Sequence, residues 1–180
     1  GHAGDAGSTP LLDGIMTFAS DVAAPTAAFV AGSLGLPGAP RETVNRMVFK
    51  EQFRKCQLEN RVNTCRCAAG KTFGDIEREA RDLRLPLVFK PVDSSGSRGI
   101  TRVDSRENGG FRKAFEEAQK MSRSGTVCAE ELAPGLDVSG DVFMGAGKVR
   151  FGGITRKHIR WPVPLGHSLP PALPAEDQRR

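Results

Sequence analysis

The sequence predicts an α+β fold, in which helices accompany an antiparallel sheet. Four segments carry apolar residues at helical spacing. Three short β-favouring segments between 126 and 154 are separated by glycine-bearing turns, which is typical of antiparallel strands. At 180 residues, the chain is long enough for one ordinary domain or two small lobes whose core needs no covalent staples.

The first third of the chain predicts a strand followed by two helices. Residues 13–18 (DGIMTF) form a short strand-like run, and the alanine-rich segment 25–35 has helical spacing and is closed by Gly35. Residues 36–40 contain two prolines and a glycine, so we expect a linker or sharp turn there. Segment 41–60 alternates charges with a partial apolar stripe, which predicts one amphipathic helix.

Two further helices are predicted in the middle of the chain. Segment 74–85 places Ile76, Ala80 and Leu83 on one side, and Pro86 ends the helix and opens the strand-like run LVFK. Segment 108–125 has apolar residues at i, i+3, i+4 and i+7: Phe111, Ala114, Phe115, Ala118 and Met121. Residues 160–174 contain five prolines, so no regular structure is expected there.

Composition excludes several functional classes. The hydrophobic content of 38% and charged content of 26% fit a soluble globular protein, and no apolar run approaches the roughly 20 residues that cross a bilayer. The opening residues resemble tag residues and lack the features of a secretory signal, so we expect a cytoplasmic protein. The net charge of +5 is spread among 21 acidic residues without a basic arm. This distribution suits a small polyanionic ligand at least as well as nucleic acid.

The four cysteines are Cys56, Cys65, Cys67 and Cys128. The close pair is spaced C-x-C, whereas zinc knuckles usually employ C-x-x-C. We therefore expect free, mostly buried thiols in a reducing compartment and no metal site.

The stretch 87–100 (LVFKPVDSSGSRGI) has the chemistry of an anion site. A loop of serines and glycines, Ser94 to Gly99, lets several backbone N–H groups converge on an oxyanion without interfering side chains. Lys90 would add a fixed positive charge at the mouth of the strand. The spacing matches neither G-x-x-x-x-G-K-[ST] nor G-x-G-x-x-G, which excludes those two phosphate motifs. The alternative is a surface hairpin in which Lys90 merely caps a strand.

The string VFKPVDSSGSRGI, followed by VCAEELAPGLDVSGDV, resembles the ATP-grasp family, in its branch of carboxylate–amine ligases related to carbamoyl phosphate synthetase and L-amino acid ligases. Upstream, Lys50 and Arg54 resemble the family's K-x-x-x-R helix, and downstream GHSLPPAL resembles the segment after the B lobe of amino-acid ligases. Cys65 and Cys67 stand where the family usually has a proline and an aromatic residue.

The resemblance implies a partial ATP-grasp fold with four parts. Residues 1–38 would be the tail of a Rossmann-like N-terminal domain, and 39–85 part of the A lobe. Residues 86–160 would form the antiparallel-sheet B lobe with its lid loop, and 161–180 a proline-rich connection. Both flanks would then be cut, making the chain a fragment of a larger ligase.

The resemblance also implies roles for individual residues. Lys50 and Lys90 would contact the ATP phosphates, and Lys90 together with Arg98 would act in catalysis. The lid over the β- and γ-phosphates would comprise Ser94, Ser95, Gly96, Ser97 and Gly99. Glu130, Glu131 and Leu132 would form the hinge that reads adenine, and Asp137 stands where the family usually has a ribose-binding glutamate.

The implied reaction transfers the γ-phosphoryl group of ATP to a carboxylate, and an amine then attacks the acyl phosphate to form an amide or peptide bond on an amino-acid-like substrate. The expected partners are Mg-ATP, a small carboxylic acid and an amine, without nucleic acid or membrane, and a homodimer is left open. The family's E…E-x-N magnesium ligands have no counterpart in this sequence, whose charged tail offers only Glu176 and Asp177. We therefore expect the Mg²⁺ ligands outside this chain and an inactive fragment.

The alternative is a non-catalytic nucleotide-binding or regulatory module that has lost the metal-binding lobe. Nucleic-acid binding through the net charge ranks last, since no motif supports it. The sequence leaves open the acid, the amine, the oligomeric state and the pathway.

Overall fold

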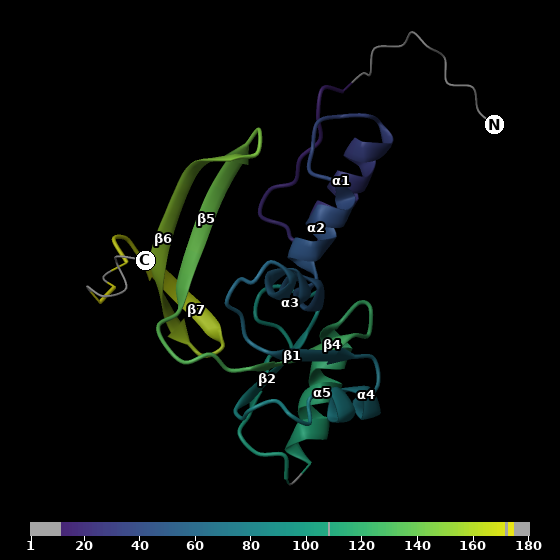
Figure 1. The fold of residues 1–180 in the computed structure, drawn as a ribbon, viewed down its shortest axis with the longest axis vertical. Helices are drawn as coiled ribbons and strands as arrows, with labels where there is room; N and C mark the ends of the chain where they lie inside the picture. The colour runs from purple at the N-terminus through teal and green to yellow at the C-terminus, as the bar shows by residue number, and fades with distance from the viewer. Residues whose placement is uncertain (1–11, 108, 172, 175–180) are drawn as a thin grey trace, which may run out of the picture. The chain divides into compact units, whose positions relative to one another are not determined.

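The computed structural model describes residues 12–107, 109–171 and 173–174. The chain divides into two units between Leu132 and Ala133 (Figure 1). The first unit contains, in chain order, α1 (Ala24–Ser33), α2 (Arg41–Val48), α3 (Lys50–Glu59), β1 (Cys67–Gly70), α4 (Phe73–Glu79), β2 (Leu87–Pro91), β3 (Thr101–Val103), α5 (Gly110–Met121) and β4 (Val127–Glu131). The second unit contains β5 (Val138–Gly145), β6 (Lys148–Arg160) and β7 (Val163–Ser168).

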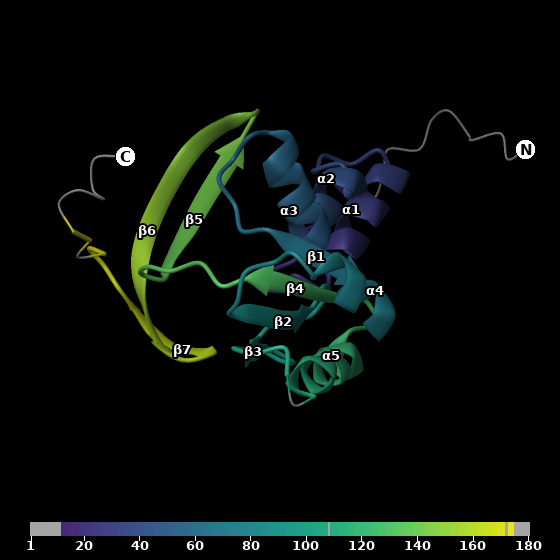
Figure 2. The same ribbon diagram turned by 60° about the horizontal axis from the view of Figure 1, so that its bottom comes forward.

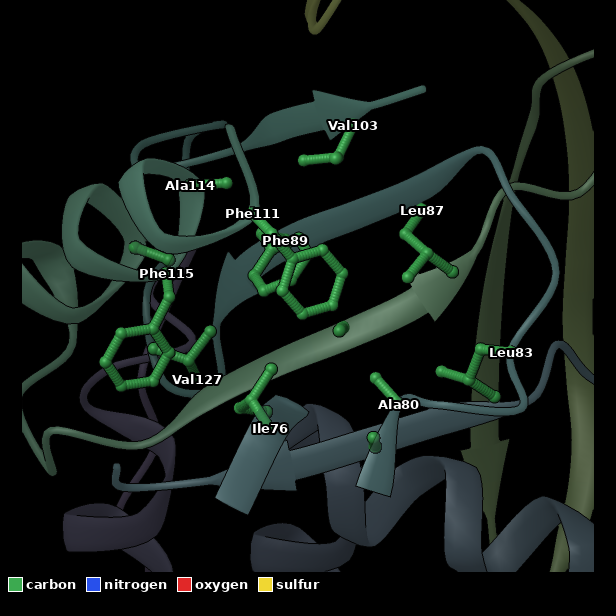
Figure 3. Close-up of a cluster of buried hydrophobic side chains, with 13 residues drawn as sticks. Ile76, Ala80, Leu83, Leu87, Phe89, Val103, Phe111, Ala114, Phe115 and Val127 are labelled. Carbon is green, nitrogen blue, oxygen red and sulfur yellow. The ribbon is translucent and has the colours of Figure 1, made fainter. Parts of the chain in front are cut away.

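The first unit is built on a four-stranded antiparallel sheet in the order β1-β4-β2-β3. Side chains alternate between its two faces, and one face carries Leu87, Phe89, Val127 and Ala129, all fully buried. Helices α4 and α5 cover this face with Ile76, Ala80, Phe111 and other apolar residues (Figure 3). The rings of Phe89 and Phe111 meet edge-to-face with centroids 4.7 Å apart. The core therefore lies on one side of the sheet, and the opposite face is left for other side chains.

The periodic helices of the middle segment are confirmed in existence but differ in length. In α5, Phe111, Ala114, Phe115 and Ala118 are buried, whereas Met121 is half exposed. Helix α4 ends at Glu79 instead of continuing to residue 85. Beyond this end, the guanidinium of Arg106 donates to the carbonyl oxygens of Ala80 and Leu83, both at 2.8 Å, which satisfies them outside the helix.

The second unit is a three-stranded antiparallel sheet in the order β5-β6-β7, in which β6 is long and curved (Figure 2). A two-residue turn joins β5 to β6, and both Ala146 and Gly147 have positive φ, as such hairpin turns require. Strand β7 corrects the expectation of irregular structure over 160–174. Pro164 is tolerated because β7 lies at the edge of the sheet, beside a register irregularity at His158 and Ile159.

Two other expectations are wrong. Residues 13–18 form no strand, and segment 41–60 is two helices rather than one. The break falls at Phe49, whose extended φ/ψ of −85°/117° ends α2. The next residue, Lys50, donates its backbone N–H to the carbonyl of Val92 at 3.2 Å, so the chain gains a bond to the turn after β2 where a continuous helix would have run.

The antiparallel α+β architecture is as predicted, but the three β-favouring segments after residue 125 are divided between the two sheets. Strand β4 pairs with β1 and β2, whereas β5 pairs with β6. The division at Leu132 falls inside the range 86–160 expected for one lobe, and that domain assignment stays a prediction. The expected tag residues and the acids of the C-terminal tail lie outside the described residues. No described helix combines the length and apolar character needed to span a membrane.

Candidate functional site

The face of the first sheet opposite the core carries polar and ionisable side chains. In the register of the sheet, Glu130 of β4 lies across from Cys67 of β1 and from Val88 of β2, and Lys90 lies across from Cys128. Because side chains alternate along a strand, these residues share one face. Helix α3 contributes Arg54 to the same face.

Glu130 is the centre of this cluster. Its Oε2 atom accepts from Nζ of Lys90 at 2.6 Å, and Arg54 donates to both carboxylate oxygens at 3.1 Å. The thiols of Cys65 and Cys128 lie 3.4 Å from Oε2 and 3.6 Å from Oε1. Only 4% of Glu130 is exposed, so little water can reach its carboxylate. The bonds from Lys90 and Arg54 therefore have to compensate the charge.

Electrostatics keep Glu130 ionised and leave the cluster positive. Burial alone would raise the pKa of Glu130, but the charge of Lys90 and hydrogen bonds from Arg54 and Lys90 outweigh it and lower the pKa to about 2. Two cations therefore face one anion in this cluster. The excess positive charge favours an anionic ligand.

Lys50 stands at the first turn of α3, close to the loop after β2. Its Nζ donates to the carbonyl oxygen of Ser94 at 2.7 Å and more distantly to that of Val92 at 3.4 Å. Burial, and after it the positive charge of Lys90, lowers the pKa of Lys50. The structure thus brings the two predicted lysines into one electrostatic environment.

The predicted lid loop is anchored at its start by Asp93. This buried carboxylate accepts from the hydroxyl of Ser122 at 3.0 Å and from the backbone N–H groups of Arg123 and Ser124 at 3.1 and 2.7 Å. The hydroxyl of Ser94 donates to the carbonyl of Met121. The end of α5 and the turn after it therefore hold the point where the loop leaves β2.

Beyond this anchor the loop adopts left-handed backbone at three residues. Gly96, Ser97 and Gly99 have φ of +70°, +57° and +68°. A Cβ at Gly99 would lie 2.9 Å from Cβ of Met121, so glycine is needed there for space as well as conformation. The exposed side chain of Arg98 donates to the carbonyl of Ser95 at 3.3 Å.

A pocket of about 630 Å³ lies against this loop. Lys50, Asp93 and residues 94–97 line it, together with apolar side chains of α2 such as Val44 and Met47. Its size is within the range of small-molecule sites, and its wall combines a lysine, loop backbone and apolar surface. The arrangement can hold an anionic group beside Lys50.

The other predicted hinge residues are engaged elsewhere. Glu131 points to the opposite face from Glu130 and binds Arg84, with Oε2 2.9 Å from Nη2 and Oε1 accepting the backbone N–H of Arg84. The backbone N–H of Leu132 donates to Pro86 at 2.9 Å. Asp137 belongs to the second unit, where its carboxylate lies 3.4 Å from Nζ of Lys157. Nucleotide roles for these residues stay predictions.

From the sequence, Arg54 is matched only to the K-x-x-x-R helix without a role of its own, and Asp93 is given no role. The spacing of Lys50 and Arg54, four residues apart on one helix, was a usable signal because such residues share a helix face. Asp93 directly follows a strand and precedes two serines, a pattern typical of a loop anchor.

The described residues do not fit a magnesium centre. None of the residues in the described ranges forms a group of three or more His, Cys, Asp or Glu side chains that could hold a metal ion.

No protein-family model matches the chain. No curated protein matches it either. Solved structures do. The L-amino acid ligase from Bacillus licheniformis is 27% identical over 90% of this chain and 34% of its own length, with a TM-score of 0.60.

Two more distant structures are also similar. The D-Ala:D-Ser ligase VanG from Enterococcus faecalis is 19% identical, with a TM-score of 0.69 over 85% of this chain and 48% of its own. A carboxyaminoimidazole ribonucleotide synthase from Aspergillus clavatus, solved with ATP, is 14% identical, with a TM-score of 0.63. The match covers 78% of this chain and 36% of that protein's chain. The chain thus spans between a third and a half of the length of these proteins.

Proposed function

The chain has a partial ATP-grasp fold, and on that premise we propose that it is the ATP-binding portion of an ATP-dependent carboxylate–amine ligase. The product would be an amide or peptide bond on an amino-acid-like substrate, formed through an acyl phosphate. Support for the reaction class comes from the likeness to an L-amino acid ligase at 27% identity.

The observation that supports the proposal is that Lys50 lies against the start of the loop of residues 94–99 and within electrostatic range of Lys90. Lys50 bonds the loop backbone at Ser94, and the charge of Lys90 contributes to lowering the pKa of Lys50. Two cations beside a glycine-bearing loop are suited to a polyphosphate, because the transferred phosphoryl group spreads negative charge over its oxygens.

Each lysine would change partners when the nucleotide binds. Nζ of Lys50 bonds carbonyl oxygens, which are weaker acceptors than phosphate oxygens, so phosphate is favoured to replace them. Lys90 keeps one acceptor in Glu130 and has two donors left for a phosphate oxygen. Arg54 would hold Glu130 in place during this exchange, since it binds both carboxylate oxygens.

The chemistry after binding follows from the same groups. Positive charge and N–H donors around the γ-phosphate stabilise its transfer to a carboxylate oxygen. The loop beyond Ser94 would cover the acyl phosphate and keep water out until an amine attacks. Arg98 lies in this loop, and its guanidinium would bind the transferred group. The Mg²⁺ that accompanies ATP would be held outside the described residues.

Isothermal titration with Mg-ATP tests the binding site. We expect the unmodified protein to bind ATP, and Lys50→Met and Lys90→Met to weaken binding by about ten- to hundredfold, because each removes a charge-assisted bond worth about 1.5–3 kcal/mol. Lys55→Met is the matched control, because Lys55 lies on the same helix with its side chain 78% exposed. Equal affinities for the Lys50, Lys90 and Lys55 variants would exclude this pocket as the phosphate site.

Hydroxylamine trapping tests the acyl phosphate in a longer protein that includes this chain. ATP and an amino acid should yield the amino-acid hydroxamate together with ADP and phosphate, because hydroxylamine intercepts acyl phosphates. Release of AMP and pyrophosphate would instead indicate an adenylate and would refute the proposed intermediate.

A further inference from the structure

Three of the four cysteines gather around Glu130, although the proposed function gives them no role. The thiols of Cys65 and Cys128 lie within 3.4 and 3.6 Å of its carboxylate oxygens, and Cys67 is its direct cross-strand neighbour. All four cysteines are free thiols.

The register of β1 and β4 places Cys67 and Cys128 next to each other. Cys67 lies across from Glu130, and Cys128 lies across from Ala69, so the two cysteines are diagonal neighbours on one face of adjacent strands. A hydrogen bond between their thiols lowers the pKa of Cys67 and raises that of Cys128 well above its usual value. The two thiols are therefore close enough to interact, although their strands must shift before a disulfide can form.

The two thiols have complementary environments. Cys67 is half-buried, whereas Cys128 is fully buried. The thiol of Cys128 and the charges of Arg54 and Lys90 lower the pKa of Cys67, and they outweigh burial and the charge of Glu130, which raise it. A partly accessible thiol near cations is the type that reacts with oxidants, and a second thiol beside it can resolve the product.

We propose that Cys67 and Cys128 form an oxidation-sensitive pair, in which a hydroperoxide converts the two thiols to a disulfide between β1 and β4 and thereby weakens nucleotide binding. The effect on nucleotide rests on the proposed function, whereas the cross-link does not.

The chemistry balances in two steps. The Cys67 thiolate attacks one oxygen of the hydroperoxide, and the O–O bond breaks. Cys67 becomes a sulfenic acid. With hydrogen peroxide the leaving group is hydroxide, which takes up the proton lost by the thiol and forms water. The sulfur of Cys128 then attacks the sulfenic sulfur, its proton leaves with the hydroxyl group as a second water, and the S–S bond forms. Two thiols thus give two electrons to one peroxide.

Cross-linking would disturb the Glu130 cluster because diagonal cysteines must move to bond. Diagonal neighbours are separated by about 7–8 Å between strands, whereas disulfides usually need shorter Cα separations. Strand β1 can give way, since it has only four residues and lies at the sheet edge. Its movement would displace Cys67 from Glu130, and Glu130 holds Lys90.

Peptide mapping tests the cross-link sharply, because trypsin places each cysteine on a separate peptide: 56–61, 62–66, 67–71 and 124–148. The protein is treated with hydrogen peroxide, alkylated and digested without reductant. We expect one linked species joining CAAGK (67–71) to 124–148, which dithiothreitol removes. Oxidation found only at Cys56 or Cys65, with Cys67 and Cys128 alkylated, would overturn the proposal.

Titration with Mg-ATP before and after oxidation tests the consequence. Oxidation should weaken ATP binding at least tenfold, and dithiothreitol should restore it. Cys67→Ala should lose both the cross-link and the effect of peroxide, whereas Cys56→Ala should retain both. A cross-linked protein with unchanged ATP affinity overturns the regulatory role. If the reduced protein binds no ATP yet forms the cross-link, the proposed function fails and the thiol pair stands as a reactive site.

Discussion

The ammonium group of Lys90 lies 2.6 Å from Oε2 of Glu130, and only 16% and 5% of the two side chains are exposed. The next residue, Glu131, faces the other side of the sheet, where it lies 2.9 Å from the side chain of Arg84, which is 83% exposed. Two consecutive buried glutamates therefore pair with cations of different exposure, Glu130 with the buried Lys90 and Glu131 with the solvated Arg84, which makes each the control for the other.

Removing the charge of Glu130 should destabilise the fold more than removing that of Glu131. Glu130→Gln leaves Lys90 and Arg54 buried without their anion, so we expect a loss of about 3 kcal/mol in the free energy of unfolding. Glu131→Gln should cost less, about 1 kcal/mol, because the guanidinium of Arg84 is solvated and the amide oxygen of glutamine can still accept the backbone N–H of Arg84. Urea unfolding at neutral pH measures the free energy of unfolding of both variants. Equal losses would show that the bonds of Glu130 to Lys90 and Arg54 contribute no more to stability than the pair of Glu131 with Arg84.

The Glu130 cluster should also make stability depend on acid. The pKa of Glu130 is about 2 in the folded protein, below its usual value of 4.5. Ionisation of Glu130 therefore stabilises the fold, and this contribution is fully present above about pH 4.5. This contribution is lost as the pH falls from about 4.5 towards 2, and its full size is on the order of 3 kcal/mol. Urea unfolding at several pH values should show a flatter acid dependence for Glu130→Gln than for the unmodified protein. Parallel curves would contradict the assignment.

Asp93 should determine the stability of the loop anchor. Asp93→Ala leaves two backbone N–H groups of the turn after α5 without their acceptor, so we expect a loss of about 2 kcal/mol. Hydrogen exchange at the Ser124 amide should accelerate. Asp104→Ala is the control, since that carboxylate is exposed and pairs with Arg102. Unchanged exchange at Ser124 would mean that the anchor is not maintained in solution.

Gly99 and Gly96 should respond differently to the same substitution. Both have positive φ, so an alanine costs about 1–2 kcal/mol in either position. At Gly99 the added Cβ also meets Cβ of Met121 at 2.9 Å, whereas at Gly96 the nearest atom is Nε of Arg98 at 4.0 Å. Gly99→Ala should therefore cost about 1–3 kcal/mol more than Gly96→Ala in urea unfolding. Equal costs would show that the loop relaxes away from α5.

Local patterns sufficed for the elements whose burial is periodic. The apolar series of α5 and the strand-like run of β2 are visible in single segments, because one helix face and one strand face enter the same core. Lys90 and the loop were found for a similar reason, since they are contiguous in sequence.

Features that depend on distant partners could not be predicted in this way. The break at Phe49 coincides with a bond from Lys50 to Val92, and the carbonyls beyond the early end of α4 are bound by Arg106. A proline-bearing strand such as β7 is acceptable only at a sheet edge, which the local sequence does not specify. Glu130 and Glu131 point to opposite faces of the sheet because side chains alternate along a strand. This can be predicted only once both residues are assigned to the same strand.

The tandem glutamates have a consequence for how β4 finds its alignment. If β4 slid by one residue against β1 and β2, Glu131 would arrive on the lysine-bearing face and Glu130 on the other, so each side of the sheet would still receive a carboxylate. Ionic attraction alone is thus indifferent between these two alignments. The choice falls to the core face, where a shift of one residue would put Thr126 or Cys128 in place of the fully buried Val127 beneath the two helices.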